Sequence, residues 1–402
     1  MDSLTQIILG AAAGEVVLGK KIGNRAMLWG AVGGTIPDLD VLGKFFLSDI
    51  DNLAFHRGIS HSIFFSILAA VALGWIVSNL YKSPYHKWIA IVCKGLAAIL
   101  VCFAAHFVLQ IFIPGNFIPT IIFSILLGLV FVRTSKKKYF DEVWEAPDAS
   151  LRNWQWLFFW SLFTHPILDC FTMYGTQLFA PFSDMRVAWS TISVVDPGYT
   201  LPFLICLIIA ALYNRSSRKR QYWNYAGIAL SSAYLLFTVV NKQRMNRSFE
   251  QALVKQNIEF ERYLTGPGIL QNILWNCTVE TKDHFYLGQR SFFDEVPITF
   301  NKIEKNHEAL IGLETDRTVK ILRWFSNEYF NVIKLDEGFQ FNDLRFGTFR
   351  GEAKSKDDYI FRFNLKDDGK GGYRMEENAG PPKGGANSLF VELMGRVKGL
   401  KK

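Results

Sequence analysis

The sequence is short of cysteine, and the signatures of several common enzyme classes are missing from it. Its five cysteines form no CxxC pair and have no regular spacing, so neither a disulfide framework nor a thiolate metal cluster is indicated. There is no glycine-rich phosphate loop, no nucleophile elbow and no dinucleotide fingerprint. These absences give no support to nucleotide chemistry or to an α/β serine hydrolase.

A cleavable signal peptide is not expected either. The N-terminus is apolar but carries no basic region, and Asp2 and Glu15 do not suit the apolar segment of such a peptide. We expect membrane insertion to rely on the spanning segments themselves.

Charged residues are scarce and unevenly placed. They make up 20% of the 402 residues, whereas hydrophobic residues make up 50% and include 35 Phe. Residues 1–240 contain long apolar runs, and residues 241–402 have the mixed charges of a soluble protein. The sequence therefore predicts two domains, an integral membrane helical domain over 1–240 and a soluble domain over 241–402.

Several apolar runs approach the roughly 20 residues that a helix needs to cross a bilayer. We predict spanning helices at 63–80, 88–113, 118–132, 154–171, 201–213 and 222–240. Two shorter runs rich in Gly and Ala, 4–18 and 26–36, are either re-entrant or packed tightly inside the bundle. The predicted fold class is a membrane all-α, multispanning bundle of about six to eight apolar helices.

The soluble domain is predicted to be an α+β or β-rich module. An apparent helix covers 243–263, and 275–291 alternates in polarity around a turn at 281–283, which is typical of a β-hairpin.

The net charge of +8 favours a membrane protein over a nucleic-acid-binding one, because many basic residues lie in short loops between apolar runs. Such loops usually face the cytoplasm, and a basic solvated surface is the alternative. If the basic loops are cytoplasmic, the connections alternate consistently and residues 241–402 are extracytoplasmic. The four loops lie at 20–25, 82–87, 133–153 and 214–220.

Three polar stretches border or interrupt the apolar runs, at 37–40, 56–62 and 165–169. Ionisable side chains are costly at such positions and usually mark a functional site. Imidazole nitrogen together with carboxylate oxygen suits zinc most, and also manganese or iron, better than calcium. The predicted metal ligands are Asp38, Asp40, His56, His61, His165 and Asp169.

The spacing of these residues allows them to converge. His165 and Asp169 are four apart and share one face of a helix. Gly58 favours a loop in which His56 and His61 meet, and Asp38 and Asp40 would point the same way in an extended loop. The alternative to metal binding is a helix cap for His165 and Asp169, and a solvated turn for Asp38 and Asp40. Six ligands exceed what one catalytic zinc takes, so either two ions bind or some of these residues orient ligating imidazoles.

Other polar residues accompany the predicted ligands. Arg57 could bind an anionic substrate oxygen or anchor at the interface. Ser60 could cap the next helix or, with Arg57, steady a developing charge. Glu15 is a candidate ligand or general base, or an interfacial carboxylate. Rim candidates in the loop after Asp169 are Asp184, Arg186 and Asp196.

These motifs resemble those of the YdjM-like family of bacterial inner-membrane proteins, which are regarded as metal-dependent hydrolases. The matching segments are MDSLTQIILGAAAGE, GGTIPDLDVL, HRGISHSIFF and THPILDCFTMYGTQLFAPFS, and the likeness extends over about 1–295. The resemblance implies a multi-pass inner-membrane protein whose metal site is formed by the six residues above, with Thr172 and Gly175 in the same motif. Many relatives have Thr-His near the start where this chain has Thr5-Gln6, which leaves one imidazole fewer unless Glu15 compensates.

The expected function is metal-dependent hydrolysis of an ester or phosphoester in a lipid or amphiphilic substrate. Metal-activated water would act at an outward-facing site that holds one or two ions. The alternatives are a metal-ion or proton-coupled transporter, and a membrane protein with a structural metal. Membrane lipid is the expected partner, and nucleic acid is not.

Overall fold

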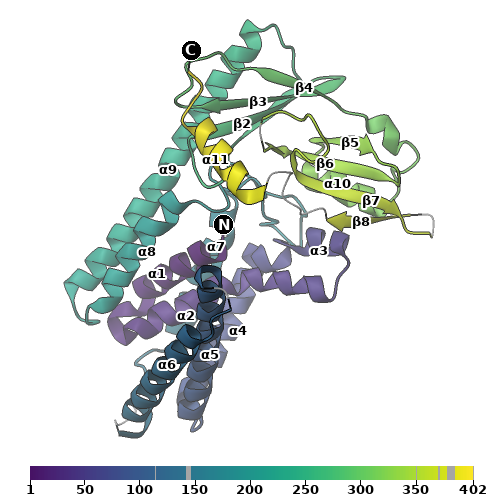
Figure 1. Ribbon diagram of the computed structural model, residues 1–402. Helices are drawn as coiled ribbons and strands as arrows, with labels where there is room; N and C mark the ends of the chain where they lie inside the picture. Colours follow the sequence, from purple (N-terminus) through teal and green to yellow (C-terminus); the bar gives the residue numbers. More distant parts are fainter. Residues whose placement is uncertain (114, 142–145, 350, 370–371, 378–384, 402) are drawn as a thin grey trace. The chain divides into compact units, whose positions relative to one another are not determined.

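The computed structural model describes residues 1–113, 115–141, 146–349, 351–369, 372–377 and 385–401 (Figure 1). The chain divides into two compact units, one formed by residues 1–70 and 157–402 and the other by residues 71–156. This division differs from the predicted one, which places the boundary between the two domains at residue 240. The predicted metal motifs and the C-terminal domain belong to the same unit.

The chain begins with a tightly packed helical hairpin. Helices α1 (Ser3–Ile22) and α2 (Asn24–Thr35) are joined at Gly23. A Cβ atom on Gly10 would lie 2.4 Å from the carbonyl oxygen of Gly30, so only glycine allows the two backbones to come this close. The sequence leaves two possibilities for the apolar segments 4–18 and 26–36, re-entrant segments or tightly packed helices. Tight packing is confirmed.

A short helical connection leads from the hairpin to the first long apolar helix. It comprises η1 (Pro37–Phe45), α3 (Asp49–Phe55) and η2 (Ile59–His61), and α4 (Ile63–Lys82) follows. The Ser62 hydroxyl accepts a hydrogen bond from the Phe65 amide at 3.0 Å. Ser62 therefore caps α4, and the prediction that Ser60 does so was wrong, because Ser60 lies inside the separate turn η2.

The second unit is built mainly from apolar helices. It contains most of α4, then α5 (His86–Phe112), α6 (Ile118–Lys136), the short turn η3 (Lys137–Asp141) and the first residues of α7 (Leu151–Asp169). The antiparallel pair α5 and α6 is linked by a hydrogen bond between the His106 imidazole and the Thr120 hydroxyl at 3.1 Å.

The first unit continues with the rest of α7, with α8 (Pro197–Leu212) and with α9 (Arg218–Lys255). Among the described residues, four helices are long and apolar enough to cross a membrane, and α8 is a shorter apolar helix. The prediction of six to eight spans was too high. The runs at 4–18 and 26–36 form a short hairpin, and α7 carries His165 and Asp169 among other polar residues. The four candidate spans are Ile63–Lys82, His86–Phe107, Ile118–Asp141 and Arg218–Lys255.

The C-terminal domain contains two four-stranded antiparallel sheets, which confirms the β-rich prediction (Figure 1). The predicted hairpin is β2 (Leu274–Glu280) and β3 (His284–Ser291), with Glu280 opposite Phe285. The first sheet has the order β1-β2-β3-β4 and the second β5-β6-β7-β8. The other strands are β1 (Arg262–Pro267), β4 (Phe300–Glu304), β5 (Phe330–Lys334), β6 (Phe339–Thr348), β7 (Tyr359–Asp367) and β8 (Tyr373–Glu377).

Short helices complete the domain: η4 (His307–Leu310), α10 (Arg317–Ser326) and α11 (Gly385–Val397). The predicted helix over 243–263 is present as far as Lys255, where it forms the end of α9, whereas residues 262–267 form β1. Helix α9 runs without a break from the apolar segment to Lys255, because Asn241 and Lys242 are polar but do not break a helix.

A buried ion pair joins α1 to α9 near their basic ends. The Arg220 guanidinium makes two hydrogen bonds of 2.6 Å to the Glu15 carboxylate, and Arg220 and Glu15 are 1% and 5% exposed. Arg220 also donates to the Asn24 side chain and to the Tyr213 carbonyl. Both charges are therefore fully satisfied within the bundle.

We predict that Arg220→Met destabilises the protein by about 3–5 kcal/mol, because it leaves the Glu15 carboxylate buried without a partner. Arg218→Met, two residues earlier and exposed, is the control. Thermal melting of the detergent-purified protein measures the effect. Equal melting temperatures of the two variants would show that the pair does not hold the helices together.

Candidate metal centre

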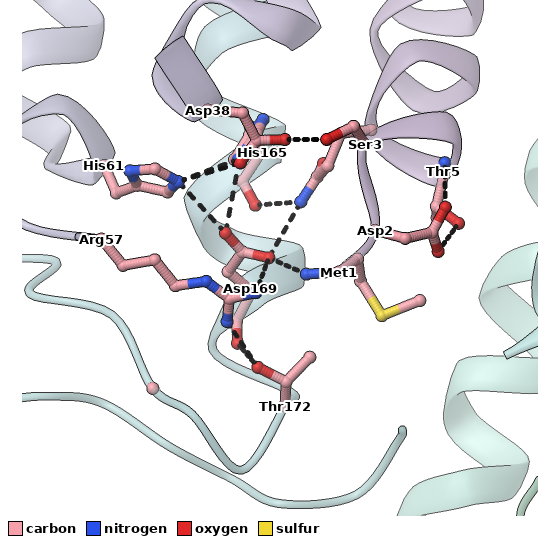
Figure 2. A network of polar contacts seen from close by, with 12 residues as sticks. Met1, Asp2, Ser3, Thr5, Asp38, Arg57, His61, His165, Asp169 and Thr172 are labelled. Atoms are coloured by element: carbon pink, nitrogen blue, oxygen red, sulfur yellow. Dashed lines mark hydrogen bonds and ion pairs between the residues drawn. The ribbon is translucent and has the colours of Figure 1, made fainter. Parts of the chain in front are cut away.

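Asp38, His61 and His165 bring one ligand atom each to a common point, within 4.8 Å of one another (Figure 2). They come from η1, η2 and α7, which are far apart in the sequence. The Nε2 atoms of His61 and His165 are 3.1 Å apart. The Asp38 Oδ1 atom lies 3.6 Å from His61 Nε2 and 3.4 Å from His165 Nε2.

Asp169 faces the same point. Its Oδ2 atom lies 3.5 Å from His61 Nε2 and 3.3 Å from His165 Nε2. In a tetrahedral zinc site with bonds of 2.0–2.2 Å, neighbouring ligand atoms are about 3.3–3.5 Å apart. Both distances from Asp169 are close to this spacing. The atoms that all lie within 4.8 Å of one another are those of Asp38, His61 and His165, and Asp169 lies beside this group of three.

Hydrogen bonds on the far side of each ring fix which nitrogen carries the proton. The His165 Nδ1 atom is 2.6 Å from the Gly34 carbonyl oxygen, which can only accept, so Nδ1 is the donor. The His61 Nδ1 atom lies 3.3 Å from the Asp40 carboxylate and 3.0 Å from the Ser60 hydroxyl, which itself donates to Asp40. Both Nε2 atoms therefore present lone pairs to the cluster, as in ligating histidines.

Electron-pair donors face one another in the cluster. They are two imidazole lone pairs and two carboxylate oxygens, and one of these oxygens, Asp169 Oδ2, is buried with no hydrogen-bond donor. Buried anionic groups are costly unless a cation or donor satisfies them. The chemistry of the donor set fits a divalent transition metal.

Asp40 and His56 stand behind the cluster rather than in it. The Asp40 carboxylate accepts hydrogen bonds from the Arg57 amide at 2.8 Å and from the Ser60 hydroxyl, and its Oδ1 atom is 2.9 Å from His56 Nδ1. The turn explains the separation from Asp38, because residues two apart on a 3₁₀ helix point about 240° apart. The extended loop expected here would have pointed both carboxylates the same way.

The pKa of Asp40 reflects its contacts. Burial by itself raises the pKa of this carboxyl group, but the hydrogen bonds with His56 and His61 outweigh it. The pKa of Asp40 therefore lies well below the usual range, and this carboxylate is ionised at neutral pH.

The other oxygen of Asp169 is held by three groups. Its Oδ1 atom contacts the Met1 amino group, accepts a 3.0 Å hydrogen bond from the Gln6 side chain, and lies 3.6 Å from Arg57 Nη2 (Figure 2). Gln6 also donates to the His165 carbonyl, while its own Oε1 atom is buried without a partner. The position that is His in many relatives thus adjoins the cluster.

Arg57 reaches the cluster from a strained backbone. Its φ of 55° is uncommon outside glycine, and the turn sends the side chain to the Thr172 hydroxyl at 2.8 Å and over the Tyr174 ring. Its Nε atom is buried with no hydrogen-bond partner. Such strain is typical of functional sites.

The remaining predicted residues lie elsewhere. The Glu15 carboxylate is paired with Arg220 and is not brought to the cluster, so it does not replace the missing imidazole. Ser60 contacts the far side of the His61 ring. Asp196 caps α8 and accepts from the Tyr234 hydroxyl. Asp184 is exposed, and Arg186 donates to the carbonyl oxygen of His56.

Two contributions were missed from the sequence. The Gly34 carbonyl orients His165, and only its place in the GGTIPDLD motif could have hinted at a role. Tyr174 lies 5.1 Å from Phe325 of the C-terminal domain, between ring centres. Ile50 of α3 also belongs to the core of that domain, so the segments that carry the cluster pack directly on it.

The two ends of α1 differ in character. At one end Gln6 adjoins the cluster. At the other, Arg215 donates to the Lys21 carbonyl at 2.7 Å and Asn24 donates to the Ala211 carbonyl at 3.1 Å. The basic loops at 20–25 and 214–220 therefore lie together, opposite the candidate metal centre.

Comparison with known proteins agrees with this arrangement. The model of the YdjM inner membrane protein family matches residues 1–245. The uncharacterized protein YfhP of Bacillus subtilis (strain 168) is 27% identical over 207 residues, which cover 50% of this chain and 60% of that protein. No solved structure matches the chain. The resemblance inferred from the motifs is confirmed, and the chain belongs to the YdjM inner membrane protein family.

Proposed function

We propose that the protein is a membrane-bound, metal-dependent hydrolase of an ester or phosphoester in an amphiphilic substrate. The observation that supports it most is the convergence of Asp38, His61 and His165, whose histidines are oriented from behind by Asp40 and the Gly34 carbonyl. Two nitrogens and one oxygen, with the Asp169 carboxylate beside them as a fourth ligand, favour a single zinc ion.

A divalent ion in this position would acidify water and polarise the ester or phosphoester oxygen. The protein supplies the other requirements. Asp38 is the ligand with the most exposed side chain, 13% against 0% for the other three, so substrate and water approach from its side. The buried Nε–H of Arg57 has no partner and is available to a substrate oxygen that gains negative charge.

A structural metal is the second candidate, and one observation favours it. Four protein ligands can close a tetrahedral site, whereas catalytic zinc sites usually keep one position open. The two functions differ in what ligand and non-ligand variants do, so experiments separate them.

We predict about one equivalent of transition metal per chain, lost in His165→Ala because the ligand is removed. Elemental mass spectrometry of the detergent-purified protein measures it. His106→Ala, which removes an imidazole from the α5–α6 pair, is the matched control and should keep the metal. Asp40→Ala should keep a weakened site, with affinity reduced about 10–100-fold. Equal metal content in wild type and His165→Ala would refute the site.

We predict that Arg57→Gln retains the metal but lowers hydrolysis about 100-fold, because it removes a donor to the developing charge. The assay uses a panel of phospholipids and chromogenic esters and phosphodiesters with zinc-loaded protein. Arg244→Gln, on an exposed position of α9, should be fully active. Metal-loaded wild type that hydrolyses nothing, together with ligand variants that melt at lower temperature, would favour the structural role.

We also propose that the protein lies in the cytoplasmic membrane with residues 241–402 outside. The basic loops support it, since the two in the first unit lie together at the end opposite the cluster. A reporter fused after residue 402 should give active alkaline phosphatase and no fluorescence from green fluorescent protein. Fusions after residue 216 should give the opposite pattern, and a reversed result would place the site on the cytoplasmic side.

A further inference from the structure

A cavity of about 420 Å³ lies within the first unit, apart from the metal ligands. Its wall comes from the segment before α8, from the turn between β1 and β2, and from strands β6 and β7 and helix α11. The volume falls in the range of small-ligand sites in proteins, which is about 300–1,000 Å³.

The wall is apolar. No side chain that lines the cavity is charged, and Leu274, Ile360 and Phe361 are among its many hydrophobic residues. The polar side chains in it mostly satisfy one another or the backbone: Gln289 donates to Asn276 at 2.8 Å, and the Ser193 hydroxyl accepts from the Leu270 amide at 3.2 Å. The Thr348 hydroxyl is the exception, since it is buried without a hydrogen-bond partner. A polar or charged ligand would therefore find few partners in the cavity.

The cavity lies close to the candidate metal centre along the chain. Met173 lines it and is four residues after Asp169, so their Cα atoms are at most about 14 Å apart. Between them, Thr172 accepts a hydrogen bond from Arg57. Tyr174, on the other side of Met173, packs with Phe361 of the wall at 6.4 Å between ring centres. One extended lipid molecule can span this distance.

The mouth of the cavity is itself hydrophobic. Val195, Ile269 and Phe390 line it and are 42%, 44% and 52% exposed. Val195 directly precedes Asp196, the cap of the apolar helix α8. An apolar chain could therefore move between a bilayer and the cavity without crossing a polar rim.

We propose that this cavity holds the acyl chain of a membrane lipid whose polar head reaches the metal centre. The substrate part of this inference rests on the proposed hydrolase function, whereas the binding of the chain does not. The C-terminal domain, which forms most of the wall, then selects the length of the chain. Each methylene group that enters raises the binding constant about fourfold.

Photo-crosslinking tests the binding directly. The full-length protein is placed in nanodiscs that contain a phosphatidylglycerol with a diazirine in its acyl chain, and labelled peptides are identified by mass spectrometry. We expect labels within 267–276 and 346–361. Ile360→Trp fills the cavity and should lower this labelling about tenfold, since two methylene groups lose their place. Ile311→Trp, at an exposed position of the same domain, should leave it unchanged.

The outcomes separate the cavity from the hydrolase. His165→Ala should be labelled like wild type, because chain binding needs no metal. If lipid hydrolysis is established, Ile360→Trp should lower kcat/KM for long chains about tenfold relative to short ones. Labels confined to the helices α4 to α6, or equal labelling of Ile360→Trp and Ile311→Trp, would overturn the proposal even if the protein hydrolyses esters.

Discussion

Two imidazole nitrogens whose lone pairs face each other, with two carboxylate oxygens beside them, are costly to bury unless cations lie close to them. This requirement organises the first unit. It ties η1, η2 and the end of α7 to one point, and the end of α1 joins through Gln6. It also explains the contacts behind the cluster, because Asp40 and the Gly34 carbonyl are needed only if each histidine must present one particular nitrogen.

The sequence predicted which residue types lie together, but not which of them face the metal site and which orient the ligands from behind. The spacing of His165 and Asp169 determines their common helical face, and the structure keeps it. The separate roles of Asp38 and Asp40 depend on a 3₁₀ turn at Pro37, which the alternation of residues did not reveal. Glu15 was indistinguishable from a ligand because its partner, Arg220, is 205 residues away. Contacts of that kind depend on packing, which local patterns do not encode.

The membrane part shows a similar limit of hydropathy. Apolar composition identified α4, α5, α6 and the apolar part of α9, which are long and apolar enough to cross a membrane. Apolar composition overestimated the number of spanning helices by counting the segments that form α1 and α2. The glycines of these two helices allow close contact between them. In the C-terminal domain, alternation located the β2–β3 hairpin because its turn residues are local, whereas the continuity of α9 through residue 240 depends on the absence of a helix breaker.

Helix α9 has 38 residues and is therefore about 57 Å long, nearly twice the thickness of the hydrocarbon core of a bilayer. It runs without a break from the basic end of the bundle into the C-terminal domain, where residues 256–261 connect it to the first strand. Insertion of a single residue would turn everything beyond it by about 100°. The domain would then be rotated away from α3 and Tyr174, on which it packs. The length of α9 is therefore constrained as strictly as the identity of the metal ligands, although no side chain of α9 belongs to the cluster.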